Sequence, residues 1–266
     1  MEGSGPLKRW SRGTYRCADG TKITCRSETV RLDKVSKREL PMNGIQSVAK
    51  DLLVVVSGAV LNRDMTEVVL GSTGRTCALP PTAVIVRPHA FYKNESIASV
   101  RLNEGLKTLE EHCFQHSGIR GLVLPASVIE VSEWAFAVCM RLRHADLSAA
   151  RGLKSLGKDA FSHCSRLRQV LLNDGLETIC PRCFSGSGVE RVAFPRTLRR
   201  VEDGTFAYCQ SLKQVDSADS ALESVDVSAF CDSGLESFTA PPSLRTIGKD
   251  AFSGCKSLKH VDLSGM

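Results

Sequence analysis

The sequence has no long apolar run, no leader-like start and no recognised catalytic motif, and each absence excludes a class of protein. No apolar stretch approaches the roughly 18 residues that indicate a membrane-spanning helix. The first residues, Met-Glu-Gly-Ser-Gly-Pro-Leu-Lys-Arg-Trp, lack the apolar core of a secretory signal peptide. Gly-x-Ser-x-Gly, His-Glu-x-x-His and protein-kinase motifs are missing as well. We therefore expect a cytoplasmic protein with no membrane span, no cofactor and no catalytic residues.

Aromatic residues and paired cysteines are also scarce. Aromatic side chains make up 6% of the chain, and the 11 cysteines are an odd number, which argues against a disulfide framework. Residues 1–80 hold 13 lysines and arginines against 8 carboxylates, while residues 81–266 are nearly balanced at 22 against 21. The basic run around Trp10 is too short for the long basic stripe of a nucleic-acid surface. Nucleic acid is therefore not the expected partner.

What the sequence does have is a phenylalanine that recurs every 22 to 25 residues. The eight copies are Phe91, Phe114, Phe136, Phe161, Phe184, Phe206, Phe230 and Phe252. A period of this length indicates a stacked repeat architecture. Such solenoids usually bind through an extended surface.

The residues around each phenylalanine follow a fixed frame, and we call each such unit a coil. Aliphatic or alanine side chains stand eight and five residues before the ring, and a small residue stands directly before it. An apolar pair spaced by two, such as Val170 and Leu172, follows and has the alternation of a short half-buried strand. We expect successive strands to pair in parallel and the phenylalanines to stack as an internal ladder.

The position three residues after the ring, the turn position, carries only Asn, Ser or Cys. Its members are Asn94, Ser117, Cys139, Cys164, Ser187, Cys209, Ser233 and Cys255. These small side chains can bond to loop backbone groups that are buried between coils, so the cysteines here are expected to be structural. In a shorter form of the turn, Ser is followed by Gly118, Gly188 or Gly234, which we place at a tight bend.

The unit Leu-x-x-Ile-Gly-x-x-Ala-Phe-x-x-Cys-x-x-Leu-x-x-Val-x-Leu is complete in residues 244–263. It resembles the BspA-like leucine-rich-repeat family, in the subclass with units of about 23 residues. The resemblance covers residues 79–266 and implies a leucine-rich-repeat solenoid of about eight regular coils, with parallel short strands joined by turns or short 3-10 segments. It further implies adhesion or protein binding at a cell surface, and it transfers no catalytic residue.

The sequence divides into three parts. Residues 1–43 form a polar, basic extension with a hairpin candidate around Asp19-Gly20. Residues 44–78 are interpreted as a degenerate capping repeat, with Val60 in the phenylalanine position, followed by an insertion loop from residue 71. Residues 79–266 form the solenoid. The last coil has no polar cap, so self-association through it is one hypothesis.

Two groups of residues could indicate an enzyme instead. Cys180-Pro-Arg-Cys183 has the Cys-x-x-Cys spacing of redox pairs, although Cys183 occupies the small position before Phe184. His89 and His112 occupy equivalent positions of adjacent coils, with His116 four residues on, but no third ligand recurs near them. A redox or metal-dependent enzyme is therefore a remote alternative, and no metal site is predicted.

The exposed columns of the strand face are the expected binding surface. One column lies between the paired apolar positions and the other directly before them. The candidate residues are Arg101, Val123, Asp146, Leu171, Ala193, Asp216, Thr239 and Asp262, with His144, Gln169, Arg191 and Gln214. Their mixture of apolar and charged side chains favours a protein ligand. We therefore predict a protein-interaction module, with an adhesive or structural part of a surface protein as the alternative.

Overall fold

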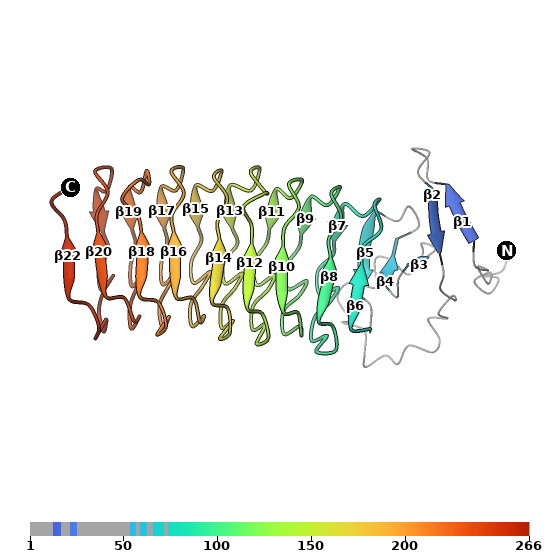
Figure 1. Ribbon diagram of the computed structural model, residues 1–266, viewed down its shortest axis with the longest axis horizontal. Coiled ribbons are helices and arrows are strands. Elements are labelled where there is room, and N and C mark those ends of the chain that lie inside the picture. The colour runs from blue at the N-terminus through green and yellow to red at the C-terminus, as the bar shows by residue number, and fades with distance from the viewer. Residues whose placement is uncertain are drawn as a thin grey trace, which may run out of the picture.

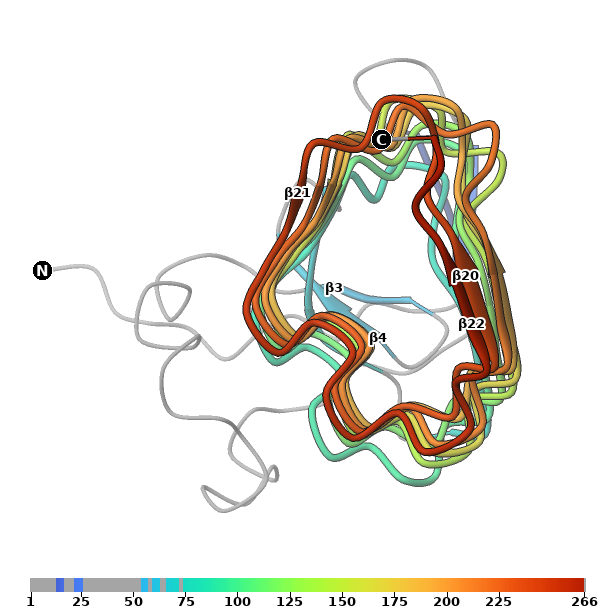
Figure 2. The same cartoon turned by 90° about the vertical axis from the view of Figure 1, so that its left-hand side faces the viewer.

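The computed structural model describes residues 13–16, 22–25, 54–56, 59–62, 66–71 and 74–265. Its regular part is a parallel β-solenoid whose coils lie side by side along one axis (Figure 1). Seen along that axis, every coil traces the same closed outline, with β21 and β20 on opposite sides (Figure 2). No helix occurs in the described ranges, and the strands are joined by turns. The predicted solenoid is confirmed.

Two sheets form the walls of the solenoid. The seven-stranded sheet contains β10 (Gly121–Val123), β12 (His144–Asp146), β14 (Gln169–Leu171), β16 (Arg191–Ala193), β18 (Gln214–Asp216), β20 (Ser237–Thr239) and β22 (His260–Asp262). The eleven-stranded sheet contains β21 (Thr246–Ile247), β19 (Ser224–Val225), β17 (Arg200–Val201), β15 (Thr178–Ile179), β13 (Ser155–Leu156), β11 (Glu130–Val131), β9 (Thr108–Leu109), β7 (Ile85–Val86), β5 (Glu67–Leu70), β4 (Ala59–Leu61) and β3 (Val54–Val56). A separate pair, β6 (Thr76–Ala78) and β8 (Ser99–Arg101), precedes β10.

The phenylalanine ladder fills the interior as predicted. Ring centroids of adjacent coils are 4.5 to 5.5 Å apart, and the ring planes lie within 10° of parallel. Seven of the eight rings are buried, and Phe252 in the last coil is half-buried. The aliphatic residues eight positions before the ring are buried in every coil. The ladder is therefore the centre of a continuous core.

The turn position satisfies backbone groups, also as predicted. The thiols of Cys139, Cys164, Cys209 and Cys255 each donate to the carbonyl oxygen of the phenylalanine one coil earlier, at 3.0 to 3.1 Å. Ser117, Ser187 and Ser233 lie next to the thiol that follows, at 3.3 to 3.5 Å. The eight cysteines from Cys113 to Cys255 form no disulfide. Four of them thus have a structural role that the repeat frame explains.

Each turn also contains two left-handed residues, which the repeat frame did not predict. The residues two before and two after every phenylalanine have φ between 53° and 72°. Most of them are not glycine, and Trp134 and Val138 are bulky. This conformation costs roughly 1 kcal/mol for a residue with a Cβ. In the first seven coils the amides at these positions and of the phenylalanine donate to the next coil, and these bonds offset the cost.

The shorter turns need glycine for a different reason from the one expected. Gly118, Gly188 and Gly234 do not have positive φ. Instead, a Cβ on any of them would lie 2.2 to 2.3 Å from a backbone carbonyl oxygen of the preceding coil. Close approach of two coils, and not a left-handed bend, therefore selects glycine here.

The N-terminal end of the solenoid differs from the predicted capping coil. β4 pairs antiparallel with β3 and β5, so Val60 lies in a small meander and does not take the phenylalanine position. Gly71 takes that position, because its amide donates to the Ala90 carbonyl and a side chain on it would overlap the Phe91 ring. The prediction for Val60 is wrong because β5 places Val68 opposite Val86, which stands five residues before Phe91, whereas Val60 in the phenylalanine position would place Val55 there.

Two further N-terminal predictions need correction. Residues 76–78 are not part of an insertion loop but form β6, which pairs in parallel with β8, and Cys77 is buried opposite Val100. β1 (Gly13–Arg16) and β2 (Lys22–Cys25) do pair as an antiparallel hairpin. However, Arg16 lies opposite Lys22, whereas a two-residue turn at Asp19-Gly20 would place Cys17 opposite Lys22. The other residues of the 1–43 extension lie outside the described ranges.

Candidate functional site

The predicted binding residues come together on the outer face of the seven-stranded sheet. Parallel register aligns Gly121, His144 and Gln169 in one column and Val123, Asp146 and Leu171 in a second. The same two columns continue through β16, β18, β20 and β22. Arg101 lies on β8, which follows β6 outside this sheet, although the Arg120 amide bonds to the Ala98 carbonyl at 3.0 Å. A binding role for these residues stays a prediction.

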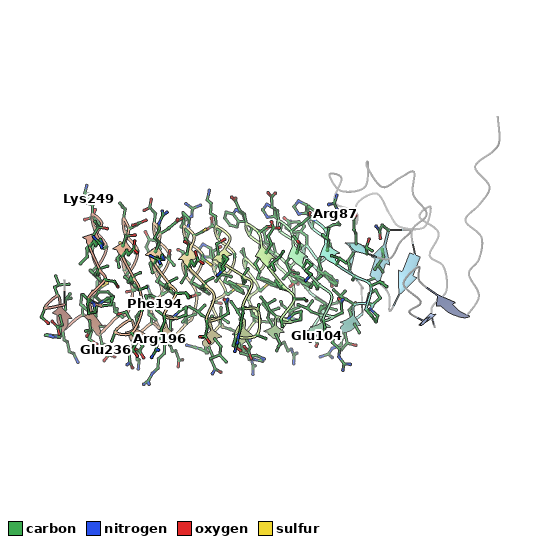
Figure 3. All side chains as sticks on the ribbon, turned by 90° about the horizontal axis from the view of Figure 1, so that it is seen from above. Arg87, Glu104, Phe194, Arg196, Glu236 and Lys249 are labelled. Carbon is green, nitrogen blue, oxygen red and sulfur yellow. The ribbon has the colours of Figure 1, made fainter. Side chains whose placement is uncertain are left out.

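The face is mixed in character. Val123 is 61% exposed and Leu171 44% exposed, and Asp146 lies between them. The His144 ring lies against Gly121, where a Cβ would come within 2.4 Å of the ring Nε2 atom. Charged side chains point outward from both walls, with Arg87 and Lys249 on one side and Glu236 on the other (Figure 3). The seven-stranded face therefore offers apolar and polar contacts on one rigid surface.

Several charged side chains elsewhere on the solenoid are paired between coils. Lys154 and Glu177 are 2.9 Å apart, and the Arg199 guanidinium contacts the Glu223 carboxylate. Arg87 contacts the carboxylates of both Glu67 and Glu110. These exposed pairs each contribute little to stability, but their alternation removes like-charge repulsion along the axis.

One cluster departs from this alternation, and the sequence-based prediction missed it. The cluster, which we call the arginine patch, consists of Arg120, Arg141, Arg143, Arg166 and Arg168. All five are exposed, on the coils of β10, β12 and β14. Comparing the residue directly before each strand across coils would have revealed it, because that position reads Arg, Arg, Arg, Glu, Lys, Glu, Lys.

The histidines do not converge on a common point. The rings of His89 and His112 are stacked, with centroids 4.9 Å apart and planes 5° from parallel, and Trp134 extends the stack. Ring-nitrogen lone pairs lie in the ring plane, so stacked rings point their nitrogens side by side. His112 Nδ1 is also 2.8 Å from the Gln115 side-chain oxygen. Burial, and secondarily the charge of His112, lower the pKa of His89. Within the described residues no three metal-ligating side chains cluster.

The cysteine pair lacks the electrostatics of a redox site. Cys183 is fully buried, and its thiol pKa is raised well above the usual value by burial. Burial, with a smaller effect of Glu202, raises the pKa of Cys180 to about 11. A reactive cysteine requires the opposite shift, because the thiolate is the nucleophile. The geometry therefore gives no support to the redox alternative.

Alkylation of Cys180 in the native protein is expected to be slow at neutral pH. With the pKa at about 11, the thiolate fraction and thus the rate rise about tenfold per pH unit up to pH 10. Iodoacetamide labelling between pH 7 and pH 10, followed by mass spectrometry of the Cys180 peptide, measures this dependence. An unfolded sample should instead level off above about pH 8.5. A native rate that levels off below pH 8 would restore the redox hypothesis.

A shallow groove of about 430 Å³ lies beside the turns of the last three coils. Tyr208, Asp232 and Gly254 occupy one left-handed column there, two residues after the ladder phenylalanines. Gly254 has no side chain, Tyr208 is 58% exposed, and Lys256 also lines the groove. The repeat frame did not predict this groove.

Comparison with known proteins identifies the fold. The family described as BspA type leucine rich repeat region matches residues 74–187 and 145–259, with six copies of the repeat. No curated protein matches the chain. Within the described residues, no helix has the length and apolarity needed to cross a bilayer.

Solved structures share the fold at low sequence identity. The leucine rich repeat protein of T. pallidum is 21% identical, with a TM-score of 0.56, over 79% of this chain and 88% of that chain. A leucine rich cell surface protein of Faecalibacterium prausnitzii is 20% identical, with a TM-score of 0.55, over 79% of this chain and 54% of that one.

A leucine-rich repeat protein of Eubacterium ventriosum is 21% identical, with a TM-score of 0.57, over 77% of this chain and 50% of that one. This chain thus spans about half the length of the last two structures. At these identities the likeness concerns the fold alone. Together, the repeat frame, the ladder and the match over residues 74–259 show that the chain belongs to the BspA-type leucine-rich repeat family.

Proposed function

We propose that this chain is a non-catalytic protein-interaction module that binds a protein ligand on the outer face of the seven-stranded sheet. The observation that carries the proposal is the alignment of exposed columns across seven strands. At about 4.8 Å per strand, these columns extend roughly 30 Å along the axis. The phenylalanine ladder beneath holds them rigid, so a ligand can bind without ordering the surface first.

The chemistry of the face supports a protein ligand. Val123 and Leu171 are exposed side chains on either side of Asp146, so apolar contact and hydrogen bonding are available together. Protein interfaces combine apolar cores with polar rims in this way. The raised pKa of the Cys180 thiol and the stacked histidines support the absence of catalysis.

Site-specific photocrosslinking tests the proposal. A photoreactive amino acid at Gln169 or Gln214 would face a ligand on the seven-stranded sheet. The matched controls are Ser155 and Thr246, which are exposed on the eleven-stranded sheet. We expect one defined protein to be captured from the first pair of positions and not from the second. Equal capture from both faces, or capture from the eleven-stranded sheet alone, would contradict the proposal.

A surface adhesin is the second candidate function. One observation favours it: the structurally similar F. prausnitzii protein is described as a cell surface protein. Labelling of intact cells that naturally produce this protein, with a reagent that cannot cross membranes, separates the two locations. Labelled lysines would place the module outside the cell, and protection until lysis would place it inside.

A further inference from the structure

The arginine patch stacks like charges on neighbouring coils. Arg120, Arg143 and Arg168 directly precede β10, β12 and β14. The amide of Arg143 donates to the Arg120 carbonyl at 2.9 Å, and that of Arg168 donates to the Arg143 carbonyl at 2.8 Å. The three residues therefore repeat at the strand spacing of about 4.8 Å. Arg141 and Arg166 occupy a second pair of equivalent positions, two residues earlier in the coils of Arg143 and Arg168.

The fold itself does not require like charges on neighbouring coils. In the next four coils the same column holds Glu190, Lys213, Glu236 and Lys259, which alternate in sign and are linked by the same backbone bonds. Like charges that lie directly opposite on neighbouring strands are destabilising. The fold thus accommodates a column in which acidic and basic residues alternate. Three successive arginines in that column lower the stability of the fold, whereas alternating charges would not. A ligand that neutralises them explains the arrangement.

Most of the patch has no acidic partner. Arg168 contacts the Glu190 carboxylate at 3.1 Å, and an Arg141 guanidinium nitrogen donates to the backbone oxygen of Glu95 at 3.2 Å. In the described part of the chain, Arg120, Arg141, Arg143 and Arg166 have no carboxylate within 4.0 Å. The planar guanidinium groups of Arg120, Arg143 and Arg166 can therefore bind carboxylates through two parallel hydrogen bonds.

The surroundings favour an acidic protein segment over a nucleic acid. Val123 and Leu171 are exposed on the same strands, and Met140, next to Arg141, is 51% exposed. The strands β10, β12 and β14 contain no Phe, Tyr or Trp on which bases could stack, and the His144 ring lies against Gly121. Arginine and methionine beside aliphatic side chains are typical of protein interfaces.

We infer that the arginine patch binds an acidic segment of a partner protein. Carboxylates of that segment pair with Arg120, Arg143 and Arg166, while an aliphatic side chain packs on Val123 and Leu171. The inference rests on the proposed function, because it names the chemistry of the ligand for the same face.

Fluorescence anisotropy of labelled probes tests this inference. The first probe is the peptide (Asp-Glu-Leu-Glu)3, and the second has serine in place of each leucine at equal charge. A labelled oligo(dT) of similar length is the third. At about 0.15 M ionic strength, where surface charges are screened beyond about 8 Å, we expect the leucine peptide to bind tightest.

Two triple variants of this chain make the test specific. Arg120→Ser, Arg143→Ser and Arg166→Ser together should weaken binding of the leucine peptide about tenfold or more, since interface arginines are common hot spots. The matched control, Lys213→Ser, Lys256→Ser and Lys259→Ser, removes the same charge from exposed positions of later coils and should change binding less than about twofold. Far-UV circular dichroism verifies that both variants are folded.

Several outcomes would overturn the inference. Equal weakening by both triple variants would indicate non-specific attraction, and tighter binding of oligo(dT) would indicate a nucleic-acid surface. If the serine peptide bound as tightly as the leucine peptide, the proposed aliphatic contact with Val123 and Leu171 would be excluded. If no peptide binds while photocrosslinking at Gln169 still captures a protein, the inference fails and the proposed function stands. If photocrosslinking captures only from the eleven-stranded sheet, the proposed function fails independently.

Discussion

Replacing Phe161 with alanine is expected to lower the free energy of unfolding by about 4 kcal/mol. Phe161 is fully buried, and its ring stacks on Phe136 at 5.2 Å and on Phe184 at 5.4 Å. Truncation of a buried phenylalanine typically costs about 3–5 kcal/mol, because burial is lost and a cavity remains. Loss of two ring contacts places this position in the upper part of that range.

The cavity left by Phe161→Ala should also reduce the cooperativity of unfolding between the two halves of the solenoid. The backbone and ladder contacts of each coil are with its immediate neighbours, so a cavity in a central coil weakens the coupling between the coils on its two sides. Urea denaturation followed by circular dichroism should therefore show a lower midpoint and a shallower transition. Phe252→Ala is the control, because Phe252 is half-buried and stacks on only one ladder ring, Phe230. Equal losses at both positions would show that the ladder is not the cooperative element.

Replacing Gly188 with alanine is expected to lower the free energy of unfolding by about 3 kcal/mol. The new Cβ would lie 2.3 Å from the carbonyl oxygen of Ser165 in the preceding coil. That oxygen belongs to the backbone, so relief requires the two coils to move apart, and the 3.1 Å bond from the Gly188 amide to the Cys164 carbonyl lengthens. Overpacking of this kind costs about 1–3 kcal/mol, with backbone clashes at the upper end.

Gly152→Ala is the matched control for this substitution. Its Cβ would lie 2.9 Å from the Cγ2 methyl of Ile129 and 3.9 Å from the Val128 carbonyl oxygen, and the Ile129 side chain is 54% exposed and can rotate aside. We expect a change within about 0.5 kcal/mol, as for most surface substitutions. Thermal and urea unfolding of the two variants give the comparison. If Gly188→Ala were as stable as Gly152→Ala, the coils would be less tightly constrained than their backbone spacing indicates.

The repeating core could be predicted because its signals are local and recur eight times. Each coil provided an independent observation of the same repeat positions, so the buried columns and the role of Cys139 or Cys209 followed from chemistry and spacing. The exposed columns of the sheet followed from the two-residue alternation of the strands. A binding role for them could not follow, since solvent-facing residues are little constrained by the fold.

The N-terminal coil could not be predicted, because it does not repeat. The frame suggested Val60 for the phenylalanine position, but an antiparallel meander shifted the register and brought Gly71 there. The left-handed conformation of the turn residues could not be predicted for a related reason. Their column contains histidine, tryptophan, aspartate and arginine, and contacts between coils impose the conformation instead of residue preference.

The sequence alone determined the solenoid, the phenylalanine ladder and the structural cysteines, because residues of one coil meet their equivalents in the next. Only the tertiary structure decided which residues from non-equivalent repeat positions become neighbours at the ends and on the surface of the solenoid. It placed Gly71 against Phe91, selected glycine at position 188 through the carbonyl of Ser165, and raised the pKa of Cys180 by burial. These outcomes depend on distances between coils, which a repeat period does not contain.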